Sequence, residues 1–171
     1  MKLFLLPLLL FSCQFHTIAQ EKTEEFRIGW PPEYDWKVVS QKDDSIQMST
    51  WIIPGNENVN TASIIGVMRL MKAVQFADSE ETLNFYRSHI DSGTVLTVLD
   101  KQDSAVHRWV LFKVETPKTN KYPEAESDLY FVIQGEYGVF ESYVAIKEAS
   151  LSRQFVKKWT KILKSGELTK Q

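Results

Sequence analysis

The feature that most constrains the fold of this chain is a series of β-rich runs joined by mostly short polar links. Between residues 94 and 146, β-branched and aromatic side chains recur with a period of two, and turn-forming residues separate the runs. Links of hairpin length join neighbouring antiparallel strands. The sequence therefore predicts antiparallel strands in four segments: residues 94–99, 106–115, 129–134 and 139–146.

Ahead of these runs, the chain carries a further hairpin and a segment of mixed character. Residues 36–41 and 46–53 favour strands and are separated by a short polar turn. Residues 62–74 fit a helical stripe as well as a strand face. We assign them to a strand, because a new helix start follows at Asp78, with Glu81 three residues later.

Two segments are predicted to be helices. The first runs from Asp78 to about His89, and the second begins near Ser152 and ends at Ser165-Gly166. The resulting order of elements indicates an α+β fold. We expect a mostly antiparallel sheet of about six or seven strands, covered on one face by two helices.

The N-terminus has the pattern of an export signal. Lys2 precedes an apolar run that ends at Phe11 and is too short to span a bilayer as a helix. Ala19 is a small residue of the kind that signal peptidase requires, whereas Cys13 lies in a sequence that looks like a lipobox. We predict that residues 1–19 are a signal peptide and that the protein is exported, periplasmic or secreted. Lipidation of Cys13, which would give a membrane-anchored lipoprotein, is the alternative.

Residues 20–171 are expected to form a single α+β domain. A chain of 171 residues with 43% hydrophobic residues can bury one sizeable core. Cys13 is the only cysteine, so the domain contains no intramolecular disulfide and its stability must come from that core.

Residues 20–35 are expected to be an extended N-terminal arm. Two consecutive prolines, Pro31 and Pro32, exclude a regular helix or a central strand there. We expect Trp30, Tyr34 and Trp36 to pin the arm to the core, and an aromatic ligand platform is the alternative.

The sequence offers few groups for catalysis. Beyond the leader only His89 and His107 remain, and neither belongs to a metal-ligand or catalytic-triad spacing. Glu124, Glu126 and Asp128 are close together, but they lack the spacing and the glycine of a calcium loop. We interpret them as a solvated acidic loop, and we predict no catalytic residue, no metal and no cofactor.

The second helix carries several basic residues beside its apolar stripe. Lys157, Lys158 and Lys161 are candidate partner-binding residues, since a basic amphipathic helix can contact an anionic membrane or a partner's groove. The same stripe can simply cover a sheet, and lysines near a helix C-terminus complement its dipole. The formal net charge of −2 gives no reason to expect a nucleic-acid partner. Membrane contact is expected only through the candidate lipid anchor.

Residues 128–138 and 143–147, followed by the helix of Trp159, carry a resemblance to a family. Together with the order of elements, they resemble the small secreted PsbP/DcrB-like α+β proteins. The resemblance is one of topology and transfers no site residue. It implies a binding or accessory module.

The sequence therefore leads us to expect an exported, non-enzymatic envelope or periplasmic protein that acts as a binding or accessory module. The alternative is a carrier of an apolar small molecule, held in a pocket between sheet and helices. A third hypothesis is a subunit that docks through the uncovered face of the sheet or through the basic helix. The partner would accordingly be a protein or an apolar small molecule.

Overall fold

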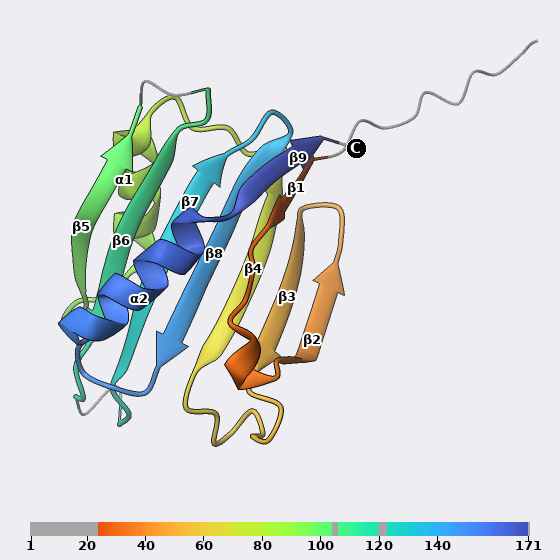
Figure 1. Cartoon of the computed structure of the whole chain (residues 1–171). Helices are drawn as coiled ribbons and strands as arrows, with labels where there is room; N and C mark the ends of the chain where they lie inside the picture. Colours follow the sequence, from red (N-terminus) through yellow and green to blue (C-terminus); the bar gives the residue numbers. More distant parts are fainter. Residues whose placement is uncertain (1–23, 104–105, 120–122, 171) are drawn as a thin grey trace, which may run out of the picture.

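The computed structural model describes residues 24–103, 106–119 and 123–170, and it confirms the α+β class. Its main element is a seven-stranded antiparallel sheet with the order β2-β3-β4-β8-β7-β6-β5 (Figure 1). The strands are β2 (Lys37–Asp43), β3 (Gln47–Ile53), β4 (Ile65–Lys72), β5 (Val95–Gln102), β6 (Trp109–Thr116), β7 (Glu126–Gln134) and β8 (Gly138–Ile146). Both predicted hairpins are confirmed, and so is the strand assignment of residues 62–74, which contain β4.

Two helices, α1 (Ser79–His89) and α2 (Arg153–Lys164), begin at the predicted caps. The carboxylate of Asp78 accepts a hydrogen bond from the backbone N–H of Glu81 at 2.8 Å. The hydroxyl of Ser152 likewise accepts one from the N–H of Phe155 at 3.1 Å. Each cap satisfies a backbone donor that the first turn of a helix leaves free.

The two helices lie on opposite faces of the sheet, so the prediction that both cover one face is wrong (Figure 1). On β6, Phe112 packs in one cluster with Leu83 of α1, whereas its neighbour Leu111 packs in another with Trp159 of α2. Apolar residues occupy both faces of β6, so each face needs a cover. On the face that carries α1, the helix contacts β5 and β6, and no helix of the described residues covers β2 to β4.

The two ends of the described chain form a separate ribbon. β1 (Glu24–Arg27) pairs antiparallel with β9 (Glu167–Lys170), and the ribbon crosses the same face of the sheet as α2 (Figure 1). The buried carboxylate of Glu24 accepts backbone hydrogen bonds from Glu136 at 2.6 Å and from Tyr137 at 3.1 Å. This contact fastens the ribbon to the turn between β7 and β8.

The rest of the N-terminal arm packs as the sequence predicts. The arm passes through a short 3-10 helix, η1 (Pro32–Tyr34), and its rings surround Trp159 of α2. Ring centroids of Trp30, Tyr34 and Trp36 lie 5.9–6.2 Å from that of Trp159. Trp30 also lies against Gly66, where a Cβ atom would come within 2.8 Å of the indole. The arm is thus pinned to the core by its aromatic residues.

Two predicted strand starts are wrong by a few residues. β6 begins at Trp109, so His107 precedes the strand and Val106 is 95% exposed. β7 begins at Glu126, so Glu126 and Asp128 belong to a strand and not to a solvated loop. The start of β7 was predicted too late, because polar residues at a strand start resemble a loop when the pairing partner is unknown. The start of β6 was predicted too early, because the β-branched Val106 favours a strand locally.

The two edges of the sheet share one irregularity. The edge strand β2 has a register shift between Val38 and Ser40, and the opposite edge strand β5 has one between Val98 and Asp100. Such bulges increase the local twist and interrupt the ladder of backbone hydrogen bonds.

Candidate functional site

The candidate functional site is a cleft of about 140 Å³ between the β1–β9 ribbon and the main sheet. Its base consists of side chains that alternate along β3, β4 and β8 onto the face that also carries α2. Cross-strand pairing places Met48 opposite Leu70 and Leu70 opposite Phe140, while Met68 lies opposite both Thr50 and Ser142. Glu25 and Phe26 of β1 form the opposite wall. We call this site the methionine cleft.

The methionine cleft is mainly apolar, with a few polar groups. Met48 and Met68 contribute flexible thioethers, which adapt to ligands of irregular shape. The Met68 sulfur lies 3.5 Å from the indole nitrogen of Trp30, which donates to it. Thr50 and Ser142 add hydroxyl groups. This lining suits an apolar group with one hydrogen-bonding substituent.

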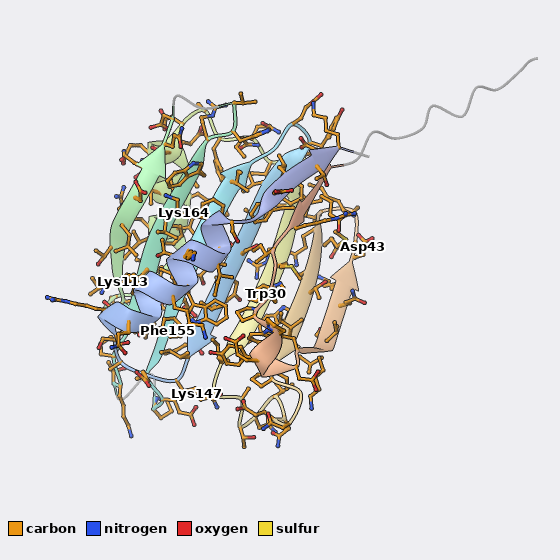
Figure 2. The ribbon with its side chains drawn as sticks, viewed as in Figure 1. Trp30, Asp43, Lys113, Lys147, Phe155 and Lys164 are labelled. Atoms are coloured by element: carbon orange, nitrogen blue, oxygen red, sulfur yellow. The ribbon has the colours of Figure 1, made fainter. Side chains whose placement is uncertain are left out.

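Trp30 marks one limit of this region. Figure 2 shows it on the near side of the sheet, where its ring faces Trp159 of α2. At the rim, Glu25 forms an ion pair of 2.7 Å with Arg27. The volume of the cleft lies below the roughly 300–1,000 Å³ of pockets for drug-sized ligands. The cleft can therefore hold a small molecule or one end of a larger one.

A second hollow lies between α1 and the sheet, at the kind of position where the sequence suggests an apolar carrier pocket. It is lined by Phe76, Thr82, Val110 and Val132, among others, and has a volume of about 10 Å³. This volume is about that needed for one water molecule.

A third, open hollow of about 300 Å³ lies beside the end of α1. Its lining includes His89, Asp91, Glu124 and Glu126. Within the described ranges, no group of three or more histidine, cysteine or acidic residues is placed so that it could hold a metal ion.

A buried ionic network occupies the opposite face of the sheet from the methionine cleft. Glu141 of β8 is 1% exposed, lies 2.9 Å from the guanidinium of Arg69 and accepts a hydrogen bond from the phenol of Tyr86 on α1. Burial raises the pKa of Glu141, and Arg69 and Tyr86 oppose that rise. Burial and the neighbouring carboxyl hold the pKa of Tyr86 well above its ordinary value. The network ties α1 to the centre of the sheet.

Asp128 is the second buried carboxyl on this face. It is 8% exposed, and its Oδ1 has no hydrogen-bond partner among the described residues. Burial, with smaller contributions from Glu126 and Glu141, raises the pKa of Asp128 to about 8. The carboxyl is therefore largely protonated at neutral pH.

The structure shows no hydrogen bond or ion pair, among the residues it describes, between either histidine and the two buried carboxyls. His89 is exposed in the last turn of α1, where its Nδ1 lies 2.6 Å from the carbonyl oxygen of Phe85. His107 is half-buried before β6. Neither histidine lines the methionine cleft.

The candidate partner-binding lysines separate into two environments. Lys158 points toward η1, where its ammonium lies 3.0 Å from the carboxylate of Glu33 and 3.1 Å from the phenol of Tyr34. Lys157 and Lys161 are exposed and have no ion-pair partner in the part of the chain that the structure describes. Of the three lysines predicted to bind a partner, only Lys157 and Lys161 are therefore without an ion pair among the described residues.

The leader of residues 1–19, including Cys13, lies outside the described residues. Among residues 24–103, 106–119 and 123–170, no helix combines the length and apolar character that crossing a membrane requires.

The methionine cleft was not predicted from the sequence. Met48 and Met68 fell within predicted strands, and alternation alone could place them on one face. The wall that β1 supplies depends on pairing between the two ends of the chain, for which no local signal exists. No protein-family model matches the chain, and no curated protein matches it in sequence.

Proposed function

We propose that this chain is an exported, non-enzymatic envelope or periplasmic protein that acts by binding, and that the methionine cleft is its ligand site. The ligand is a small, mainly apolar molecule or the apolar end of a larger one. One observation carries the proposal: an apolar cleft with two thioethers and accessible polar groups lies between the sheet and the β1–β9 ribbon. The relation to PsbP/DcrB-like proteins is part of this proposal, and the antiparallel sheet with two helices supports it.

The lining of the cleft favours binding over catalysis. It includes the hydroxyl groups of Thr50 and Ser142, but none of its residues is a histidine, cysteine or lysine that could activate them. The side chain of Glu141 is directed to the opposite face, where it meets Tyr86. Glu25, the other carboxylate of the lining, lies at the rim and is held in an ion pair with Arg27.

The site differs in place from the carrier pocket that the sequence suggests. That pocket would lie between sheet and helices, where the hollow beneath α1 has room for about one water molecule. The methionine cleft lies instead between the sheet and the ribbon. A binding protein of this design would release its ligand when the ribbon moves.

The proposal is tested with the fluorescent probe 8-anilino-1-naphthalenesulfonate and the protein purified after export. We expect the native protein to enhance the fluorescence of the probe. Thr50→Phe, which fills the cleft from its exposed side, should lose most of that enhancement. Thr97→Phe, the same change on the exposed edge strand β5, is the matched control. Equal enhancement by all three proteins would place the binding elsewhere and overturn the proposal.

Two further measurements test the other parts of the proposal. The mass of the exported protein distinguishes a chain that begins at Gln20 from one acylated at Cys13, and a chain that keeps its whole leader would contradict export. A panel of hydrolase substrates tests the absence of catalysis. Turnover that disappears in His89→Ala or His107→Ala would contradict a non-enzymatic role.

A further inference from the structure

Helix α2 is strongly basic, whereas the chain as a whole carries a net negative charge. The helix carries five basic residues and no acidic one, in a chain whose formal net charge is −2. We propose that the outer face of α2, defined by Arg153, Lys157 and Lys161, docks on the surface of an anionic lipid bilayer. This goes beyond the proposed binding function, because it uses none of the residues of the methionine cleft.

The geometry of the helix leaves this face free. Trp159 and Leu163, which are 1% and 0% exposed, point into the core and use the apolar stripe of α2. Arg153, Lys157 and Lys161 recur every four residues, so they follow one side of the helix at intervals of about 6 Å. All three are exposed, and no carboxylate of the described residues forms an ion pair with them.

The remaining cations of α2 are already engaged. Lys158 contacts Glu33 and Tyr34, as described above. Lys164 forms an ion pair of 2.8 Å with Asp100, and its ammonium lies 4.2 Å from the ring centre of Trp109. The free charge is therefore concentrated on the outer face and is not spread around the helix.

The position of α2 favours contact with a flat surface. The helix lies on top of the sheet as the outer layer of its face (Figure 1). A ridge of this kind can approach a bilayer, where each lysine or arginine near an anionic surface strengthens binding. The apolar stripe takes no part, so the contact is electrostatic and needs no insertion into the bilayer.

A lipid surface fits this face better than an acidic protein does. The outer positions of α2 hold only basic residues and Gln154, while Phe155 and Trp159 pack against each other at the inner side. Stable protein interfaces have a desolvated centre with aromatic anchors, and lysine is depleted there. Adsorption to anionic lipids requires only the cations. The inference differs from the sequence-based prediction that membrane contact comes only through Cys13.

Vesicle sedimentation tests the inference with the protein purified after export. The vesicles consist of phosphatidylcholine with or without phosphatidylglycerol, at low salt and at about 0.5 M NaCl. We expect binding to the anionic vesicles at low salt only. The double variant Lys157→Glu/Lys161→Glu should weaken that binding at least about tenfold.

The control variant Lys42→Glu/Lys118→Glu changes the net charge by the same amount at exposed sites outside α2, and it should bind as the native protein does. Thr50→Phe should also bind normally, which separates this inference from the methionine cleft. Binding to pure phosphatidylcholine at both salt concentrations would assign attachment to a lipid anchor and overturn the inference. Unchanged binding by the α2 variant would overturn it as well. Failure of the native protein to bind anionic vesicles at low salt would also overturn the inference. An acidic protein would then be the partner to test.

Discussion

At the scale of single residues, the unusual feature is the buried carboxyl group of Asp128, whose Oδ1 has no hydrogen-bond partner among the described residues. Asp128 lies on β7 between Val114 of β6 and Ala145 of β8, neither of which offers a polar side chain. A charge in such a place is unfavourable, so the group keeps its proton to a much higher pH than in water.

We predict that Asp128 makes the protein less stable as the pH rises from about 4 to about 8. The unfolded chain loses the proton of Asp128 near its ordinary pKa of 3.8, whereas the folded chain keeps it up to a pKa of about 8. The folded state then binds more protons, so the free energy of unfolding falls with pH and becomes level above 8. The free energy of unfolding of Asp128→Asn, relative to that of the native protein, should therefore rise by about 1.4 kcal/mol for each pH unit in this range. Urea denaturation at a series of pH values measures the difference, and a constant difference would contradict the prediction.

The hydrogen bond between Tyr86 and Glu141 leads to a second prediction at this scale. Tyr86→Phe removes the phenolic donor and leaves a buried carboxylate oxygen unsatisfied, which should lower the free energy of unfolding by about 1–3 kcal/mol. Tyr137→Phe, the same change at a more exposed tyrosine, should alter it by less than about 0.5 kcal/mol. Chemical denaturation compares the two variants, and equal losses would show that Glu141 does not depend on Tyr86.

At the scale of elements, the β1–β9 ribbon connects the two ends of the described chain to the site. It supplies one wall of the methionine cleft, and Glu24 fastens it to the turn before β8. Gly166, directly before β9, packs tightly against β1, because a Cβ atom there would collide with the ring of Phe26. Movement of the ribbon therefore changes the shape of the cleft.

We predict that Glu24→Ala loosens the ribbon. The change leaves the backbone amides of Glu136 and Tyr137 without their carboxylate acceptor, at a cost of about 1–3 kcal/mol. Amide hydrogen exchange in β9 should become faster, whereas exchange in the central strand β8 should change little. Glu24→Gln keeps one carbonyl acceptor and should have a smaller effect. Unaltered exchange in β9 would mean that the ribbon is held by its backbone pairing alone.

Local signals were sufficient to predict most of the elements. Caps such as Asp78 and Ser152, and the alternation within each strand, act over only a few residues, so they are visible in the sequence. The face that each helix covers was not visible, because Val110, Leu111 and Phe112 are all apolar and leave both faces of β6 to be buried. Pairing between β1 and β9 joins segments from opposite ends of the chain and left no local signal.

The contrast between local signals and contacts of distant segments also explains which parts of the site could be predicted. The basic character of α2 is visible in the sequence, but the predicted set of Lys157, Lys158 and Lys161 included Lys158, whose contacts with Glu33 and Tyr34 depend on the folded N-terminal arm. Asp128 was interpreted as a solvated residue because other carboxylates precede it, and its burial depends on two neighbouring strands. The methionine cleft depends on three strands of the sheet and on the ribbon, so its residues cannot be grouped before the fold is known.

At the scale of the whole molecule, one sheet serves as the partner of both helices. The core clusters on its two faces alternate along the same strands, so neither face can lose its packing without disturbing the other. We predict a single cooperative unfolding transition. Tryptophan fluorescence, to which the cluster around Trp159 contributes, and far-ultraviolet circular dichroism should give the same midpoint. Separate midpoints would mean that the α1 and α2 sides unfold independently.

The irregular edge strands have a consequence for the protein in a crowded compartment. A straight edge strand offers its free backbone groups as a template, and another chain can extend the sheet from it. In this molecule β2 and β5 each interrupt that template with a bulge, and Lys37, Lys42 and Lys101 place positive charges along the two borders. Copies of the protein that meet edge to edge would therefore find no continuous row of backbone groups to join, which disfavours growth of the sheet beyond its seven strands.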